Sequence, residues 1–310
     1  MSGFFLPKGK NMKVLSAYIT VIIIWSTTPL GIQWSGNDVG FAFGVASRMV
    51  IGLIALLIIT RIWSISLPWD RHSRLVYLAG GIPLFLAMSL VYWSAQYIPS
   101  GWISVIFGLT PFITSLFARV ILGDKSFTPA KTSGMLLGLF GLMIVFAESI
   151  DISHQALLGV GGVCLSAIVH SLSSVLIKKL NPVIHPVSIT TGSLLVATPL
   201  FVANAIYAGV PEHIPMQSML AIIYLAIMGS ALGFPLYFYC LKQLHAQRVA
   251  LITLITPVLA LILGSGLNQE VISPRIWYGT LCILTGLTIY EYGQYLSLKK
   301  YWLRWTRYPL

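Results

Sequence analysis

The chain has 310 residues, of which 57% are hydrophobic and only 9% are charged, and its mean hydropathy is +0.86. Soluble domains carry roughly 25% charged residues, so this composition excludes a water-soluble globular protein, and it equally excludes a disordered chain, which would be polar and charge-rich. The net charge of +11 does not indicate nucleic-acid binding, because the basic residues lie in short clusters between apolar runs.

Ten apolar runs are long enough to cross a hydrocarbon core about 30 Å thick as helices. In chain order they are 14–34, 39–60, 75–97, 102–122, 129–147, 156–177, 186–208, 218–241, 249–267 and 276–296. The first run is expected to stay in the protein, since it is long and no A-x-A-like cleavage site follows it. The sequence therefore predicts an all-α integral membrane protein with ten transmembrane helices.

The connectors between these runs alternate in charge. Of the 19 Lys and Arg residues, 16 lie in one set of connectors, namely 1–13, 61–74, 123–131, 178–185, 242–248 and 298–310. The other set, 35–38, 98–101, 148–155, 209–217 and 268–275, holds Arg275 alone. Because basic loops stay on the cytoplasmic side, we expect both termini, 1–13 and the basic tail 298–310, to be cytoplasmic.

The two halves of the chain resemble each other. Residues 101–146 align with residues 247–290, so that Pro111 matches Pro257 and Asp124 matches Glu270. The glycines of the following runs match as well, which divides the chain into repeats at 14–147 and 156–297. Five spans are an odd number, so the second repeat must be inverted in the membrane. Inverted repeats are typical of secondary transporters, whose substrate site lies near midplane between the halves.

These features resemble the drug/metabolite transporter superfamily, specifically its ten-helix EamA-type branch. The similarity runs over nearly the whole chain and is strongest in the repeated proline, acid and glycine pattern, in Ser47-Arg48 and in residues 229–241, GSALGFPLYFYCL. Two departures are Asp124, where the family usually has Glu, and the lack of an Arg48 equivalent in the second half. The resemblance implies a bacterial inner-membrane protein that transports small metabolites, often exporting amino acids or related compounds.

Arg48 is a charged residue inside the second run, about nine positions from its start. A charge near midplane costs roughly 2.5–3.5 kcal/mol on insertion scales and therefore faces the bundle interior or a wet cavity. Arg48 would either dock a substrate carboxylate or phosphate, or serve as a structural residue bonded to carbonyls and polar side chains.

Aromatic and hydroxyl side chains around Arg48 are expected to line a central cavity for amphipathic or aromatic solutes, although each aromatic ring could instead serve helix packing. The predicted substrate-binding residues are Trp25, Ser26, Arg48, Tyr92, Trp93, Gln96, Thr110, His170, Ser171, Ser174, Tyr237 and Thr256. Pro111 and Pro257 each remove a helical hydrogen bond, and they would act either as hinges beside the cavity or as bends in closed helices.

Two titratable residues are candidates for proton coupling. His170 lies in the sixth run, and its ordinary pKa suits proton transfer at physiological pH. Glu291 is the one acid inside a predicted span, and intramembrane acids often serve proton relays. A hydrogen-bonded packing histidine and an interfacial or ion-paired glutamate are the alternatives.

The chain is thus predicted to be a secondary-active exporter of small metabolites that works by alternating access between its halves. Its expected partners are a small-molecule substrate, the lipid bilayer and a proton as coupling ion. No enzyme activity, cofactor, metal site, nucleotide or nucleic acid is expected, since the sequence has no P-loop and no metal-ligand spacing. A broad exporter of lipophilic cations or drugs and a non-transporting membrane scaffold are the alternatives.

Overall fold

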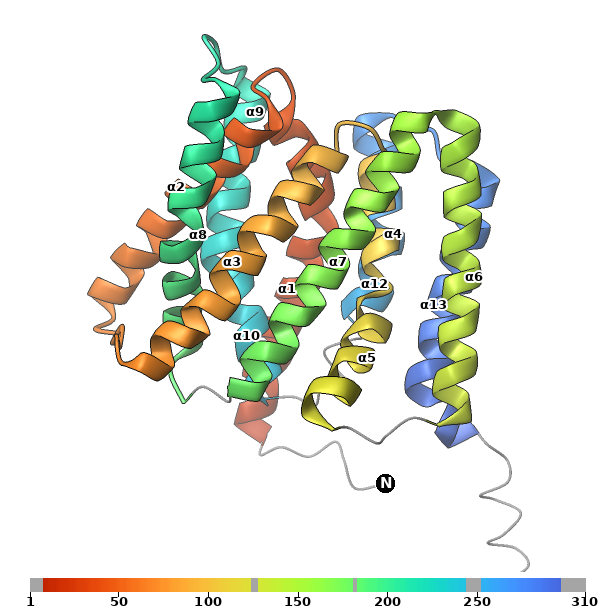
Figure 1. The fold of residues 1–310 in the computed structure, drawn as a ribbon, viewed down its shortest axis with the longest axis horizontal. Helices are drawn as coiled ribbons and strands as arrows, with labels where there is room; N and C mark the ends of the chain where they lie inside the picture. The colour runs from red at the N-terminus through yellow and green to blue at the C-terminus, as the bar shows by residue number, and fades with distance from the viewer. Residues whose placement is uncertain (1–7, 124–127, 181–182, 244–251, 297–310) are drawn as a thin grey trace, which may run out of the picture.

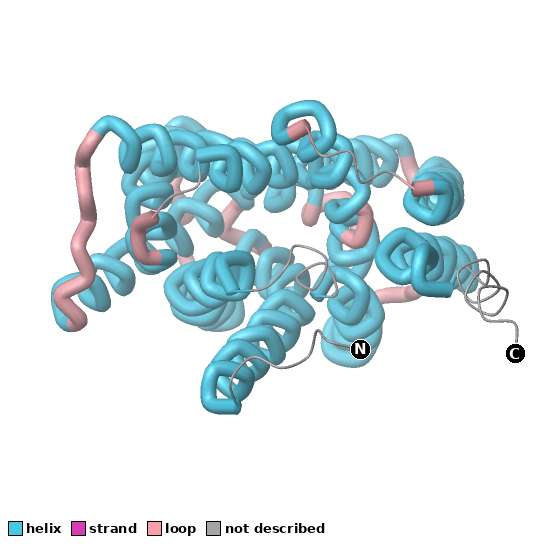
Figure 2. Tube along the Cα trace, turned by 90° about the horizontal axis from the view of Figure 1, so that it is seen from below, coloured by secondary structure: helices cyan, strands magenta, loops and turns pink. Residues whose placement is uncertain are grey.

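The computed structural model describes residues 8–123, 128–180, 183–243 and 252–296, and all regular structure in these residues is helical (Figures 1 and 2). The first half contains six helices: α1 (Lys8–Gly36), α2 (Phe41–Ile62), α3 (Arg71–Ser94), α4 (Ser100–Phe107), α5 (Thr110–Leu122) and α6 (Pro129–Ile152). The second half contains α7 (His154–Leu180), α8 (Pro186–Ala208), α9 (Met216–Tyr224), the π-helix η1 (Leu225–Gly233), α10 (Phe234–Gln243), α12 (Ile252–Asn268) and α13 (Pro274–Leu296).

These elements group into ten helical units, because α4 and α5 together make one and α9, η1 and α10 make another. Eight units are long and apolar enough to cross a bilayer by length and composition. The described part of α12 gives a shorter apolar stretch, Ile255–Asn268, and α13 lies against α6. The predicted all-α architecture of ten helices is confirmed.

The fourth span differs from the expected continuous helix, because it breaks between Phe107 and Thr110. Pro111 lies in the first turn of α5 and has no N–H to donate to the Phe107 carbonyl, so the helical ladder cannot continue through it. The Thr110 hydroxyl donates to that same carbonyl instead. The freed backbone group therefore has a partner inside the bundle, as a membrane environment requires.

Helix contacts follow the pseudo-symmetry of the two repeats. Three contacts join equivalent spans, namely α2 with α8, α4 with α12 and α6 with α13. The packing of α3 against α7 is mirrored by that of α1 against α9, η1 and α10. Each repeat therefore packs largely against the other, and sites at the bundle centre are built from both.

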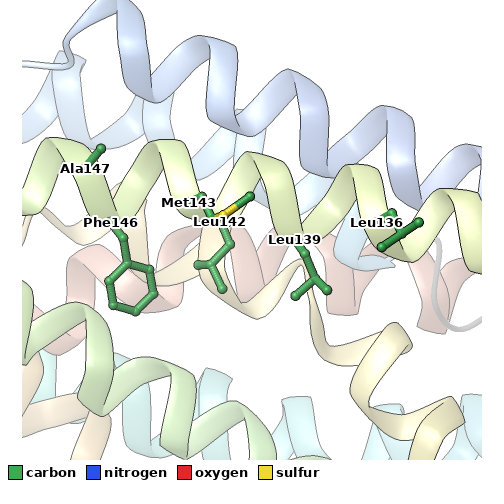
Figure 3. Close-up of a pocket in the computed structure, with 6 residues that line it drawn as sticks. All are labelled: Leu136, Leu139, Leu142, Met143, Phe146 and Ala147. Carbon is green, nitrogen blue, oxygen red and sulfur yellow. The ribbon is translucent and has the colours of Figure 1, made fainter.

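Glycines set the close packing of α6 against α13. A Cβ atom at Gly134 would lie 2.4 Å from the Gly286 carbonyl oxygen, and one at Gly141 would lie 2.6 Å from that of Gly279. Small residues allow membrane helices to approach backbone to backbone in this way. Along α6 runs a groove of about 610 Å³, lined by Leu136, Leu139, Leu142, Met143, Phe146 and Ala147. Of these residues, Leu139, Leu142 and Phe146 point away from α13 (Figure 3). This lining is apolar throughout and suits contact with hydrocarbon.

The loops at 37–40, 95–99, 209–215 and 269–273 lie at one end of the bundle, the upper end in Figure 1, opposite the start of α1. We call this end the distal face.

Candidate functional site

Arg48 lies in the eighth position of α2, about 10 Å along a helix that begins at the distal face. Its side chain is only 2% exposed. The guanidinium Nε donates to the Ser230 hydroxyl at 3.0 Å, and Nη1 donates to the Tyr92 hydroxyl at 3.4 Å. Ser35, near the end of α1, donates to the same Tyr92 oxygen at 3.3 Å. Four elements, α1, α2, α3 and η1, thus meet at one buried cation.

The hydrogen-bonding groups around Arg48 are neutral. The ion pair that joins Arg275 to Glu148 at 3.5 Å lies elsewhere, at the distal ends of α13 and α6. A buried charge without a countercharge is unfavourable, and a guanidinium has five donors, more than its two hydroxyl partners use. The guanidinium therefore gives this buried site a positive charge.

Close packing around Arg48 depends on glycines. A Cβ atom at Gly229 would lie 2.9 Å from Nη2 of Arg48, and one at Gly52 would lie 2.8 Å from the Ser230 Cβ. Both Gly229 and Ser230 belong to η1, a π-helix of nine residues. π-helical segments are rare and occur frequently at functional sites. This segment, which sequence patterns did not distinguish from an α-helix, packs directly against the Arg48 side chain.

An aromatic cluster lies at the C-terminal end of η1. The rings of Trp25 and Tyr237 lie 4.8 Å apart, and His170 lies 6.4 Å from Tyr237 and 6.2 Å from Phe107. A Cβ atom at Gly233 would lie 3.9 Å from Nε1 of Trp25. Since Gly233 is three residues from Ser230, η1 connects this cluster to Arg48.

The break between α4 and α5 adjoins the same cluster. Ser171 on α7 donates to the Thr110 carbonyl at 3.4 Å, which ties α7 to the break. A Cβ atom at Gly108 would lie 3.8 Å from the Pro257 ring, so Pro257 lies beside the break that Pro111 follows. Pro257, unlike Pro111, lies inside a continuous helix.

Most of the remaining predicted residues lie apart from this centre or bond within their own helices. Trp93 stacks edge-on with Tyr97 at 5.1 Å near the distal face, and the exposed Gln96 donates to the Trp93 carbonyl. Ser26 donates to the Ile22 carbonyl of its own helix. Ser174 donates to the His170 carbonyl and also hydrogen-bonds Tyr237 of the aromatic cluster. Thr256 is 6% exposed, and the side chain of Glu291 lies outside the described residues.

Metal ligation finds no support in the part of the chain that the structure describes. No group of three His, Cys, Asp or Glu side chains is close enough to hold an ion. Cys164, Cys240 and Cys282 are free thiols.

The EamA-like transporter family model matches residues 12–147 and again residues 157–291. The chain belongs to the EamA-like transporter family. It is therefore a multi-pass membrane transporter of the drug/metabolite transporter superfamily and not an enzyme. The two EamA segments coincide with the halves of the fold, so the Arg48 network joins the first EamA copy to Ser230 of the second.

Two of the relatives of this EamA protein match about nine tenths of its length. The uncharacterized transporter YoaV of Bacillus subtilis is 25% identical over 280 residues, which cover 89% of this chain and 96% of YoaV. A probable terminal-alkyne amino-acid exporter of Streptantibioticus cattleyicolor is 22% identical over 90% of this chain and 94% of its own length. A probable amino-acid metabolite efflux pump of Escherichia coli is 25% identical over 63% of this chain and 68% of its own.

A solved crystal structure supports the fold. It superposes with a TM-score of 0.64 at 20% sequence identity and covers 90% of this chain and 97% of its own. The fold of this chain is thus shared with a protein of known structure.

Proposed function

We propose that this EamA protein is a secondary-active exporter of small amphipathic metabolites, such as amino acids or related compounds, in a bacterial inner membrane. Arg48 docks the anionic group of the substrate, and the aromatic cluster of Trp25, Tyr237 and His170 contacts its apolar part. The observation that carries the proposal is a 2% exposed guanidinium held by neutral hydroxyls on elements from both repeats.

Two relatives carry names that agree with this substrate class, one an amino-acid metabolite efflux pump and one an amino-acid exporter, both described as probable. An exporter of lipophilic cations would be expected to place an acid at its centre, whereas the described centre holds a cation. This difference favours anionic or zwitterionic substrates.

We test the role of Arg48 with Arg48→Gln. Because glutamine keeps hydrogen-bonding capacity but lacks the charge, we expect it to abolish transport while the protein still inserts in the membrane. Metabolite profiling of cells with and without the protein identifies the solute, and efflux from vesicles at matched protein levels measures its rate. The control is Arg61→Gln, which removes an exposed arginine from the end of the same helix. Equal rates for Arg48→Gln and the control would show that Arg48 is structural.

The proposal includes a proton as the coupling ion, with His170 as the proton carrier because its imidazole lies beside Tyr237 and Phe107 at the centre. His170→Gln should uncouple substrate movement from proton flux, measured as substrate-induced acidification in vesicles. Persistence of the proton flux in His170→Gln and its loss in Glu291→Gln would assign coupling to the glutamate instead.

A further inference from the structure

A second polar network lies at the distal face, away from the Arg48 site, and we call it the distal cluster. It contains Gln33, Trp34, Ser100, Gly101, Asn268 and Glu270. The first four residues belong to the first EamA copy and the last two to the second. All of these bonds except the one from Asn268 to Glu270 therefore cross the boundary between the repeats.

Glu270 caps a helix of the opposite repeat. Its carboxylate accepts from the backbone N–H groups of Ser100 at 3.0 Å and Gly101 at 3.3 Å, in the first turn of α4. The N-cap residue of α4 is Pro99, which provides no side-chain cap. Free N–H groups at a helix start attract a negative charge. Glu270, from the other repeat, therefore provides the N-terminal cap that α4 lacks among its own residues.

Asn268 extends the contact to α1. Its amide nitrogen donates to Gln33 Oε1 at 2.9 Å and to Glu270 Oε1 at 3.0 Å. Its amide oxygen accepts from the Trp34 indole N–H at 2.8 Å. The end of α12 is thereby bonded to both α1 and α4.

The backbone around Glu270 orients its side chain toward α4. Gln269 has a positive φ of 54°, and the Glu270 N–H donates to the Gly264 carbonyl at 3.2 Å. A Cβ atom at Gly264 would lie 2.4 Å from Glu270 Oε2. The carboxylate thus occupies space that any larger residue at position 264 would fill.

We propose that the distal cluster is the latch that holds the distal mouth of the transport path closed and that breaks when this mouth opens. Alternating access requires each face to close in turn, and bonds between the repeats are the ones that a relative movement of the halves breaks. Gln33, Trp34, Asn268 and Glu270 are only half-buried, so water can replace each broken bond. Opening of the distal mouth therefore costs little free energy, because the net contribution of each hydrogen bond is small. The inference goes beyond the proposed substrate site and shares with it only the alternating-access cycle.

Accessibility from the distal face tests the latch without any substrate. In a background where Cys164, Cys240 and Cys282 are replaced by alanine, Ser104→Cys places a reporter on α4, one turn inside Ser100, where the native side chain is 6% exposed. The probe is a membrane-impermeant maleimide added to vesicles of each orientation. Glu270→Gln should raise the labelling rate from the distal side by about tenfold, the equivalent of one charge-assisted hydrogen bond.

Two matched glycine variants control for misfolding as the cause of increased labelling. Gly264→Ala should raise labelling as Glu270→Gln does, whereas Gly266→Ala, whose Cβ would meet nothing within 4 Å, should leave it unchanged. Glu212→Gln, which removes an exposed acid from the same face, is the charge control. Labelling of Glu270→Gln and Gly264→Ala at the rate of these controls would overturn the proposal.

Cross-linking tests whether the latch must open during transport. Gln33→Cys and Asn268→Cys joined by a cleavable bis-methanethiosulfonate should stop transport, and reduction should restore it, whereas each single variant treated alike keeps transporting. Full transport through the cross-linked protein would overturn the latch. If no solute is transported by the native chain but distal labelling still rises in Glu270→Gln, the latch stands and the proposed export function fails.

Discussion

Arg48 illustrates how a membrane protein accommodates a buried cation with hydroxyl groups. The planar guanidinium reaches Ser230 and Tyr92 in different directions at once, a geometry that a lysine ammonium could not reproduce from one rotamer. Each hydroxyl can accept from Arg48 and still donate elsewhere. The network therefore orients the charge without neutralising it, which is the property that an anion-binding residue needs.

Gly229 controls the position of this guanidinium. Gly229→Ala would place a methyl group 2.9 Å from Nη2 and displace the side chain, at a cost of about 0.5–1.5 kcal/mol for an off-rotamer arrangement. We expect transport to fall by up to about tenfold, measured as the efflux rate from vesicles. Gly161→Ala, where the new Cβ has open space, should transport normally, and equal rates in the two variants would contradict this account.

The residues of the Arg48 network differ in how well sequence could find them. Arg48 is conspicuous because charges inside apolar runs are rare, and Tyr92 belongs to a segment that recurs in both repeats. Ser35 and Ser230 went unpredicted, because serines are frequent throughout the chain and only tertiary packing selects the two that meet Arg48 and Tyr92. Phe107 was also missed, because only tertiary packing places this phenylalanine beside His170.

At the scale of elements, hydropathy predicted where spans lie but not their internal geometry. Apolar content is the same in an α-helix, a π-helix or a broken helix, so neither η1 nor the break before Thr110 changes the pattern. Pro111 did mark the region of the break. The π-helix had a weaker signal, two glycines and a serine in GSALG, which also fits ordinary close packing.

The start of α8 provides a pH-sensitive element. His185 caps this helix by accepting the Val187 N–H on Nδ1 at 3.3 Å, and partial burial together with the nearby Lys242 lowers the pKa of His185 below its ordinary 6.5. The folded state therefore binds fewer protons than the unfolded one. The stabilising cap is fully present above pH 6.5 and is lost as pH falls through the lowered pKa.

Amide hydrogen exchange in the first turn of α8 measures this effect. After correction for intrinsic rates, residues 187–189 should exchange faster near pH 5 than near pH 8, since protonated Nδ1 cannot accept a hydrogen bond. His185→Asn, which caps without titrating, should show a flat profile. A pH-dependent profile that persists in His185→Asn would assign the change to another group.

At the scale of the whole molecule, the two EamA copies form one bundle in which contacts between copies follow a pseudo-two-fold pattern. The chemistry is less symmetric than the fold. Arg48 has no counterpart in the second half, and Ser230, which holds it, comes from that half. Duplication thus provided the scaffold, and a residue in one copy gives the centre its charge.

The orientation of this bundle is a prediction from loop charge. Because basic loops remain on the cytoplasmic side, reporter fusions after residues 70, 125, 182 and 245 should report the cytoplasm. Fusions after residues 99, 151, 213 and 270 should report the opposite side. An exchange in either series would contradict the predicted orientation, and a mixture within one series would contradict the inverted repeat.

The separation of Arg48 from its partners along the chain has a consequence for biogenesis. Ser230 follows Arg48 by 182 residues, which ribosomes synthesise in about 10–40 s at typical rates. During this interval α2 must remain in the bilayer with its cation lacking the Ser230 bond, held by the high hydropathy of its other residues, 2.3 on average over its best window. Substitutions that make the lipid-facing side of α2 more polar, for example at Ile54 or Ile58, would therefore impair insertion by the translocon before they could affect the finished transporter.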